Sequence, residues 1–337
     1  MATHLNDIKK IYQQTDEAVN LLQSALNTDY LTALSETLAN LVQKTVHVEN
    51  EAPNQETVAK LHQLYREIKW ANLTSEQRLA LGQLLIFRRQ QVDKPQANFQ
   101  ATPSTIGVLI SLVATVVFGR QQSSLKITDP VVGTGSLLLT VGQQLQRTYP
   151  ELSLIGLDNN DELLALAAAW ADFLNDKLML VHQDALTPWL TEQKPDLVIA
   201  DLPVGYYPLD SRASEFELHA KSGHSFAHYL LLEQSINALP NAGWGIFVVP
   251  ANLFESDAAL TLLRWLTKHA FLQMSLSLPK SAFQDGTADK AIIVLQKHGA
   301  RAKQAKEVLI ANVPDMNQID AMRRFSQQMQ LWATENL

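Results

Sequence analysis

The stretch ITDPVVGTGSL occupies residues 127–137 and decides the fold. An apolar segment runs into an acid and a proline, and Gly133 and Gly135 then lead into a second apolar segment. Glycine allows a tight turn and a close approach of the backbone to a ligand. The stretch therefore predicts a strand, a ligand-binding turn and a helix in direct succession.

The chain downstream of this turn alternates between short apolar segments and segments with helical spacing. Such alternation predicts a parallel sheet with helices on both faces. Ligands bind such sheets at the carboxyl ends of the strands, so the residues that follow each strand are the candidate site residues. We expect strands at 125–128, 152–157, 179–182, 197–200, 244–249, 274–278 and 291–296, and helices at 136–145, 163–174, 226–239, 258–269 and 319–332.

The beginning of the chain has a different pattern. Residues 1–92 carry leucines at helical spacing and no cluster of catalytic residue types, which predicts an all-helical N-terminal domain for packing or partner binding. Within it we expect helices at 57–70 and 75–89, the second begun by Ser75 without a complete capping box. Residues 93–337 form the second predicted domain.

The composition limits the function. The 337 residues are 46% hydrophobic and 18% charged, which suits a globular protein with a full core. The absence of cysteine excludes disulfides, thiolate metal ligands and a cysteine nucleophile. With a net charge of −7, any binding of nucleic acid needs a local basic patch or another subunit. The longest apolar stretch, 106–118, is shorter than a membrane span, so we expect a soluble cytoplasmic protein.

The turn after the first strand differs from the common phosphate-binding loops. A dinucleotide fingerprint needs a third glycine where Leu138 stands, and a phosphate loop needs a lysine that this turn lacks. Asp129 would repel phosphates but suits a ligand with an ammonium group. Asp158 ends the second strand, where an acid accepts both ribose hydroxyls. Asp184 follows the third strand and either accepts the adenine amino group or serves as a cap or solvated loop acid. A nucleoside with an ammonium group matches S-adenosylmethionine.

The end of the fourth strand makes a family resemblance specific. Residues 201–204 read Asp-Leu-Pro-Val, which resembles the Asn/Asp-Pro-Pro-Tyr/Phe turn of the N6-adenine DNA methylase family. The branch concerned contains type I modification subunits and their stand-alone relatives. The family's Asp-Pro-x-x-Gly-Thr-Gly loop matches residues 129–135, and its Thr-Pro pair matches residues 102–103. The resemblance extends over residues 95–312.

This resemblance implies an α/β fold, namely a seven-stranded, Rossmann-like methyltransferase sheet with helices on both faces. Its late antiparallel strand would be 274–278 or 291–296. It also implies S-adenosylmethionine as cofactor and no metal. The residues that it places at the cofactor are Thr102, Asp129, Pro130, Gly133, Gly135, Asp158, Asp184 and Asp201.

The chemistry of the family's catalytic turn explains its residues. The Asn/Asp side chain and the next backbone carbonyl accept the two N–H groups of an amine whose lone pair is delocalised, and an aromatic ring stacks on the flipped base. Here Asp201 and Pro203 are kept and Leu202 still offers its carbonyl, but a valine stands where the ring is expected. We hypothesise that Tyr206 or Tyr207 supplies the ring. The alternative is a turn that retains cofactor binding without methylating a base.

Two further groups of residues were considered as sites. His224 and His228 are spaced for one helix face, but without a third ligand they do not predict zinc, and a place in the substrate cleft suits them better. A basic run follows the last strand, and it is more typical of a solvated loop face than of a nucleic-acid contact. The run consists of Lys297, Arg301, Lys303 and Lys306.

The sequence thus predicts an S-adenosylmethionine-dependent N-methyltransferase. Its expected substrate is adenine in nucleic acid, most simply DNA, with RNA or a protein amide as alternatives. No segment resembles a domain that reads base edges, so a separate specificity or partner protein is expected. The competing hypothesis is a cofactor-binding regulatory or scaffold protein without turnover.

Overall fold

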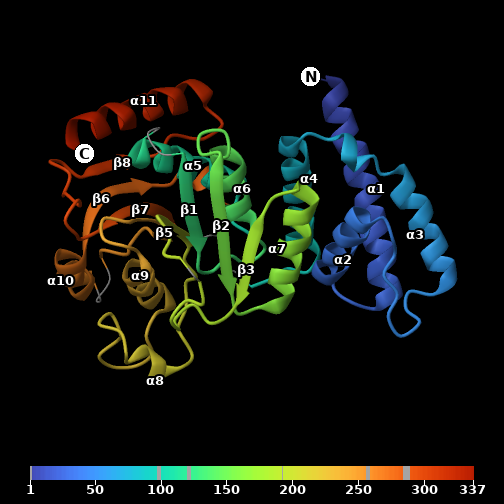
Figure 1. Cartoon of the computed structure of the whole chain (residues 1–337), viewed down its shortest axis with the longest axis horizontal. Helices are drawn as coiled ribbons and strands as arrows, with labels where there is room; N and C mark the ends of the chain where they lie inside the picture. The colour runs from blue at the N-terminus through green and yellow to red at the C-terminus, as the bar shows by residue number, and fades with distance from the viewer. Residues whose placement is uncertain (1, 97–99, 120–122, 192, 256–258, 284–288) are drawn as a thin grey trace.

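The structure is a computed structural model that describes residues 2–96, 100–119, 123–191, 193–255, 259–283 and 289–337. Its centre is one eight-stranded sheet in the order β3-β2-β1-β4-β5-β7-β6-β8 (Figure 1). The strands are β1 (Ser124–Asp129), β2 (Glu151–Asp158), β3 (Leu178–His182), β4 (Leu197–Asp201), β5 (Trp244–Pro250), β6 (Ala270–Ser277), β7 (Lys290–Lys297) and β8 (Leu309–Asn312).

The strand directions decide where the ligand edge lies. The five strands from β3 to β5 are parallel, so their carboxyl ends share one edge of the sheet. β7 is antiparallel to both β5 and β6, which identifies it as the late antiparallel strand. An antiparallel strand begins where its parallel neighbour ends, so the first residue of β7 lies at the ligand edge.

The α/β architecture is confirmed, with one correction to the strand count. The sheet has eight strands and not seven, because β8 adds to β6 in parallel. β8 is four residues long with alternating burial, and its Ile310 side chain is exposed. So short a segment has no pattern that distinguishes it from a loop, and its pairing with β6 depends on contacts distant in the sequence.

Helices cover both faces of the sheet. One face packs against α5, α6 and α11, and the other against α9 and α10. The apolar segment predicted to be buried is α5, which lies between the sheet, α6 and α11. Residue 258, the first residue of the helix predicted at 258–269, lies outside the described residues. The helices are α5 (Ser104–Phe118), α6 (Ser136–Leu145), α7 (Asp161–Leu174), α8 (Asp210–Ala213), α9 (Ala227–Ala238), α10 (Ala259–His269) and α11 (Ile319–Asn336).

The N-terminal region is helical, as expected, and its core continues into the sheet domain. Its helices pack around Trp170 of α7, a fully buried side chain, in one apolar cluster. The N-cap of the helix predicted at 75–89 is Thr74 and not Ser75, and Thr74 forms a complete capping box with Gln77. The helices are α1 (Ala2–Leu26), α2 (Tyr30–Gln43), α3 (Gln55–Glu67) and α4 (Ser75–Val92). Within the described residues, no helix combines the length and apolarity needed to cross a bilayer.

Candidate active site

The turn after β1 is shaped by its two glycines. Gly133 and Gly135 adopt φ angles of 51° and 80°, in the left-handed region that other residues rarely enter. A Cβ at Gly133 would point into open space, whereas one at Gly135 would lie 3.1 Å from Leu139. The hydroxyl of Thr134 is buried without a hydrogen-bond partner among the described residues. The turn therefore leaves room beside the Gly133 backbone, and it holds one buried polar atom without a partner among the described residues.

Asp129 lies at the base of this turn and is 1% exposed. Its Oδ1 accepts the backbone N–H of Val131 at 3.0 Å. Burial raises the pKa of the Asp129 carboxyl well above its usual value, and the negative charges of Asp158 and Asp201 add to this effect. A cationic group bound here would favour the carboxylate form. The site therefore suits an ammonium or sulfonium ligand better than an anion.

Asp158 links the first two turns. Its Oδ2 accepts the N–H of Gly133 at 2.8 Å, and its Oδ1 accepts that of Asn160 at 3.0 Å. Burial raises the pKa of Asp158, and these backbone hydrogen bonds partly offset the shift. Because each carboxylate oxygen has two lone pairs, Asp158 keeps the capacity to accept two further hydroxyl hydrogens. This arrangement fits a ribose diol.

A cavity of about 140 Å³ opens between these turns. It is walled by the ends of β1, β2 and β3 together with residues after β4, and Pro130, Asp158, Asp184 and Pro203 are among its lining residues. Asp184 contributes a carboxylate whose Oδ1 accepts the Leu186 N–H at 2.9 Å. The cavity thus brings together predicted cofactor residues that are up to 54 positions apart (130 to 184).

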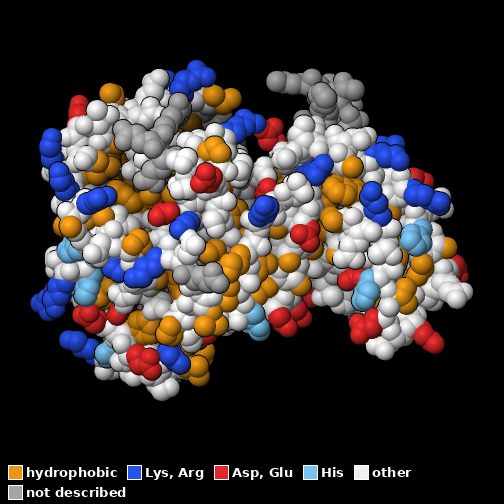
Figure 2. All heavy atoms as spheres, viewed as in Figure 1, with side chains coloured by type: hydrophobic (Ala, Val, Ile, Leu, Met, Phe, Trp, Pro, Cys, Tyr) orange, Lys and Arg blue, Asp and Glu red, His pale blue; other side chains and the backbone are white. Residues whose placement is uncertain are grey.

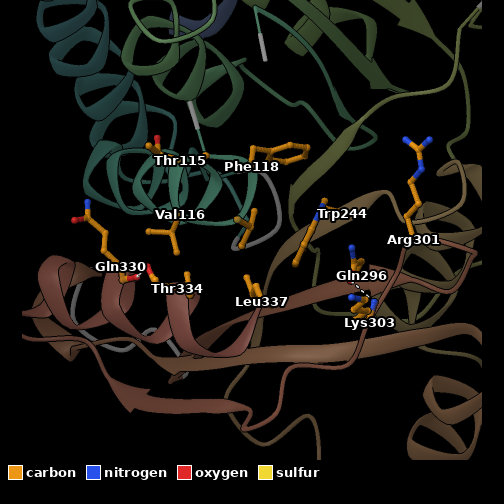
Figure 3. A pocket seen from close by; sticks show the side chains of 13 residues that line it. Thr115, Val116, Phe118, Trp244, Gln296, Arg301, Lys303, Gln330, Thr334 and Leu337 are labelled. Carbon is orange, nitrogen blue, oxygen red and sulfur yellow. Dashed lines mark hydrogen bonds between the residues drawn. The ribbon is translucent and has the colours of Figure 1, made fainter. Parts of the chain in front are cut away.

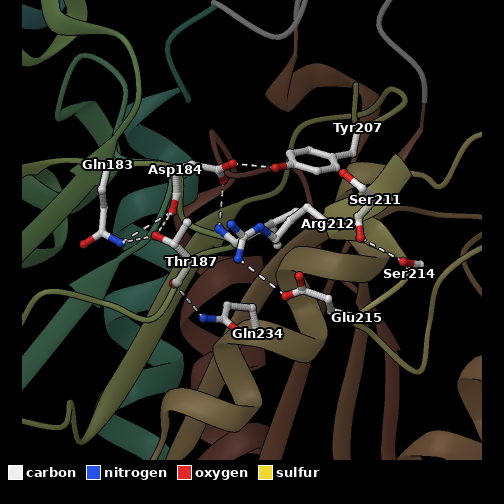
Figure 4. A network of polar contacts seen from close by, with 10 residues as sticks. Gln183, Asp184, Thr187, Tyr207, Ser211, Arg212, Ser214, Glu215 and Gln234 are labelled. Carbon is white, nitrogen blue, oxygen red and sulfur yellow. Dashed lines mark hydrogen bonds and ion pairs between the residues drawn. The ribbon is translucent and has the colours of Figure 1, made fainter. Parts of the chain in front are cut away.

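Tyr207 also lines this cavity. Its hydroxyl donates to Asp184, and its side chain is 9% exposed (Figure 4). Burial and the acceptor Asp184 raise the pKa of the Tyr207 hydroxyl, so it remains a donor at neutral pH. Figure 4 also shows the side chains of Gln183 and Gln234, which both donate hydrogen bonds to Thr187. Tyr207 is therefore a wall of the cavity and has no open ring face for stacking.

The turn after β4 holds its acid on two sides. Asp201 Oδ2 accepts the Thr102 hydroxyl at 3.0 Å, which connects the Thr-Pro segment to the turn. Asp201 Oδ1 accepts the Lys290 ammonium at 2.7 Å. Two of the four lone pairs of the carboxylate are then used, so it can still accept an N–H from a substrate.

The backbone carbonyl of Leu202 is left available by a proline. The Leu202 N–H donates to Val248 of β5 at 3.0 Å, in the parallel ladder of β4 and β5. The next amide that this ladder would offer to the Leu202 carbonyl belongs to residue 250, which is proline and has no N–H. The second acceptor of the turn is therefore not satisfied by the neighbouring strand.

An exposed pair of rings lies beside the turn. Tyr206 is 63% exposed and stacks on Phe226, with ring centroids 4.6 Å apart and planes at 22°. The two residues form an isolated antiparallel bridge, and the Ala227 N–H donates to the Gly205 carbonyl at 2.8 Å. Of the two tyrosines predicted from the sequence, Tyr206 is the one with an accessible face.

The two histidines and two lysines of the basic run have structural partners. His224 contacts the carboxylate of Asp210, whereas His228 is buried against the ring of Tyr229. Lys297 donates to the Asn237 and Leu239 carbonyls at the end of α9, at 2.8 and 2.7 Å. Lys306 donates to the Glu335 carbonyl at the end of α11. These two lysines cap helices, which agrees with a structural role for much of the run.

A second, larger cavity of about 940 Å³ lies elsewhere (Figure 3). It is lined by the end of α5, by Trp244 at the start of β5 and by α11. The start of a parallel strand is the edge opposite to the ligand edge. Its charged side chains, Arg301 and Lys303, are basic, and none of the acids described above reaches it. We therefore place the candidate active site at the smaller cavity.

Comparisons with known proteins identify the family of the chain. The family model described as N-6 DNA Methylase matches residues 90–332, and a model described as the YtxK N-terminal helical domain matches residues 9–88. Because the first match covers more than half of the 337 residues, the chain belongs to the N-6 DNA methylase family. Its fold is that of S-adenosylmethionine-dependent N-methyltransferases.

Individual relatives span nearly the whole chain. The YtxK protein of Bacillus subtilis (strain 168) is 35% identical over 323 residues, which are 96% of both chains. A Listeria monocytogenes protein assigned to the class I S-adenosylmethionine-dependent methyltransferases is 32% identical, with a TM-score of 0.88 over 97% of this chain and 99% of that one. The methyltransferase subunit of a type I restriction-modification system from Streptococcus thermophilus shares the fold, with a TM-score of 0.67, 15% identity and coverage of 96% and 74%.

Three residues of this site were not identified as functional from the sequence. Lys290 stands 89 positions after its partner Asp201, and no local motif marks it. Pro250 and Phe226 lie in segments that resemble the family, but their relation to Leu202 and Tyr206 appears only when the strands are aligned. The expected late antiparallel strand could have pointed to Lys290, because the first residue of such a strand must lie at the ligand edge.

Proposed function

We propose that this protein is a methyltransferase that transfers the methyl group of S-adenosylmethionine to the exocyclic amino nitrogen of adenine in DNA. The observation that carries the proposal is the turn after β4. It presents the Asp201 carboxylate and the Leu202 carbonyl as two acceptors beside a cavity that Asp158 and Asp184 line. Two acceptors side by side are what an NH₂ group on a planar ring requires.

The cofactor residues are proposed from the contacts around the cavity. Asp129 would hold the ammonium group, Asp158 the ribose hydroxyls and Asp184 the adenine amino group. Gly133 and Gly135 would let the backbone approach, with Pro130 as a cavity wall. Thr102 would hold Asp201 in place through its hydroxyl, which lies 3.0 Å from the Asp201 carboxylate.

S-adenosylmethionine supplies an electrophilic methyl group on a sulfonium. Asp201 and the Leu202 carbonyl accept the two N–H groups of the substrate and draw its nitrogen out of conjugation. When bound, S-adenosylmethionine would supply the methyl group and leave as the neutral thioether, and the substrate nitrogen would lose one N–H proton to solvent. The residues act by positioning the two reactants in line.

The target base is proposed to stack on Tyr206, which Phe226 supports from behind. This ring would replace the aromatic residue that the family has at the position of Val204. Base stacking on an aromatic side chain contributes about 1–3 kcal/mol. The location of Tyr206 two residues past the turn accounts for a catalytic motif that ends in valine.

Recognition of a DNA sequence is proposed to need a second protein. Lys and Arg side chains are scattered among acids on the face shown in Figure 2, and they form no continuous basic patch there. The type I modification subunits with this fold belong to multi-subunit systems. We propose that the helical region 1–92 contributes to partner binding, with 93–337 as the catalytic domain and the cytoplasm as its location.

The competing function is a cofactor-binding regulator without turnover. Two observations favour it: the catalytic turn lacks its own aromatic residue, and the Asp201 carboxylate is paired with Lys290. RNA or a protein amide is an alternative substrate, and the following experiment distinguishes it from DNA.

The test is incubation of the purified protein with radiolabelled S-adenosylmethionine and separate pools of host DNA, RNA and protein. We expect label in the DNA pool. The label should be lost in Asp201→Ala and kept in Asp172→Ala, a control substitution at an exposed residue. Label in the RNA or protein pool instead would overturn the DNA assignment. Cofactor binding by calorimetry with no label in any pool would favour the regulator.

A further inference from the structure

A lysine from the antiparallel strand lies against the proposed catalytic acid. Lys290 is the first residue of β7, and it pairs in register with Pro250 at the end of β5. This register brings Lys290 to the ligand edge, where its Nζ lies 2.7 Å from Asp201 Oδ1. The side chains of Lys290 and Asp201 are 19% and 16% exposed, so the pair is largely shielded from water.

The surroundings of Lys290 fix its ammonium group in one place. The Nζ lies 5.6 Å from the ring centroid of Phe283, a distance at which a cation is attracted to the ring face. The backbone around it is held as well, because the Lys290 carbonyl accepts the Leu278 N–H and the Asp289 carbonyl accepts the Ala251 N–H. Lys290 is thus a preorganised cation and not a mobile surface lysine.

The charge of Lys290 matters because the ligand edge is otherwise acidic. Asp158 and Asp184 line the cavity, and Asp129 and Asp201 end the neighbouring strands β1 and β4. Among the described residues, Lys290 is the ammonium group in contact with one of these acids. Paired in this way, Asp201 carries little net charge and still offers lone pairs to an N–H donor. It then resembles the asparagine that the same family turn uses.

We propose that Lys290 is a positioning residue for Asp201, which it holds in one orientation and neutralises. The inference rests on the proposed function in its assignment of Asp201 to the substrate amino group. In the proposed reaction the transferable methyl group would face the nitrogen that Asp201 holds, which would bring the sulfonium close to the pair. Without Lys290, the bare carboxylate would form an ion pair with the sulfonium, stabilise the ground state and turn away from the substrate.

The test compares two ligands that differ in charge at sulfur. S-adenosylmethionine carries a sulfonium and S-adenosylhomocysteine a neutral thioether, so the ratio of their dissociation constants reports the charge near sulfur. Calorimetry is performed on the wild type, Lys290→Met, Lys290→Arg, Asp201→Asn and the double variant Lys290→Met/Asp201→Asn. A loss of packing alone changes both constants in parallel and leaves their ratio unchanged.

Lys290→Met is expected to shift the ratio about fivefold or more in favour of S-adenosylmethionine, because an uncompensated carboxylate attracts the sulfonium. Asp201→Asn, which leaves the lysine uncompensated, is expected to shift it in the opposite direction. The double variant and Lys290→Arg are expected to return to the wild-type ratio. The shifts of the two single variants are therefore opposite in sign and cancel in the double variant.

Ratios that stay within about twofold of the wild type in both single variants would overturn the proposal. If Lys290→Met does not fold, the ligand ratios of Asp201→Asn and Lys290→Gln still test the proposal. Where the radiolabel assay shows turnover, Lys290→Met is expected to lower kcat more than it alters KM, with rescue by Lys290→Arg. Because the ligand ratio needs no turnover, failure of the proposed function and failure of this inference give different results.

Discussion

The two halves of the ligand edge are built on different principles. At the ends of β1, β2 and β3, the proposed cofactor residues sit in or directly after their own strands, and each acid is oriented by a backbone N–H close in sequence or in the next turn. At the end of β4, the proposed catalytic residues are oriented from far away, by Thr102, Val248 and Lys290. The cofactor half is local, and the substrate half is assembled by tertiary structure.

This difference explains how the catalytic turn can depart from its family pattern. In the proposed function, Tyr206 replaces the aromatic residue missing at Val204, and Phe226, on another segment, supports its ring. By the further inference, a carboxylate stands in for an amide at Asp201 because Lys290, on another strand, lies against it. Substitutions in the cofactor half lack such distant compensation, so we expect them to have the larger effects.

The largest effect is expected from Asp129→Asn. Removal of the carboxylate that would pair with the cofactor ammonium should weaken binding of S-adenosylmethionine by about a hundredfold, as for a buried charge-assisted hydrogen bond. Calorimetry measures the change, and Asp161→Asn, an exposed acid of α7, is the matched control. Equal affinities of Asp129→Asn and the wild type would remove Asp129 from the cofactor site.

The same variant tests the pH dependence of binding. An ammonium ligand needs the carboxylate form of Asp129, and burial raises the pKa of this group. The wild-type affinity should therefore decline as the pH falls, starting at a higher pH than for an ordinary carboxyl. In Asp129→Asn this contribution should be absent. An unchanged pH profile in the variant would assign the titration to another group.

A smaller effect, about tenfold on kcat/KM, is expected for Tyr206→Ala, because one base-stacking surface is lost. Cofactor affinity should not change. Tyr207→Phe should show the reverse behaviour, since its hydroxyl supports Asp184 in the cofactor cavity and its ring faces no substrate. Steady-state kinetics with calorimetry separate the two. A loss of turnover confined to Tyr207→Phe would shift the stacking role away from Tyr206.

Pro250→Ala tests whether the Leu202 carbonyl is kept available. The N–H that this substitution introduces at position 250 should pair with the carbonyl and lower kcat by about fivefold, the equivalent of one hydrogen bond. Hydrogen exchange provides a measure independent of activity, because the amide of residue 250 should be protected. Pro150→Ala, an exposed proline before β2, is the control. Rapid exchange at residue 250 would contradict the ladder argument.

The smallest effect concerns stability and His228. Burial lowers the pKa of His228 from 6.5 to about 4. The unfolded chain then takes up a proton in this range that the folded chain does not, so stability falls as the pH drops from 6.5 towards 4. Between pH 7.5 and 5.5 the loss is about 1 kcal/mol. Urea unfolding of His228→Phe should show a smaller loss than the wild type, whereas His224→Gln should not.

The sequence predicted the cofactor half more completely than the substrate half. The turn at 129–135 and the acids that end or follow β2 and β3 are encoded by neighbouring residues, so local spacing was sufficient to find them. The N-cap at Thr74 was misplaced by one residue and strand β8 was missed, because each depends on a short segment. Tyr206 and Tyr207 could not be told apart by sequence, since only the packing of Tyr207 against Asp184 buries one of them.

The sequence by itself determined the alternation of strands and helices, the glycine turn and the acids at the strand ends, because backbone conformation and period are local properties. Tertiary structure alone decided that Lys290 lies against Asp201, that Pro250 stands at the ladder position next to the Leu202 carbonyl and that the core of the N-terminal helices continues around Trp170. These contacts join residues that are between 48 (202 to 250) and 89 (201 to 290) positions apart at the catalytic turn. They depend on strand order and direction, which the fold as a whole selects.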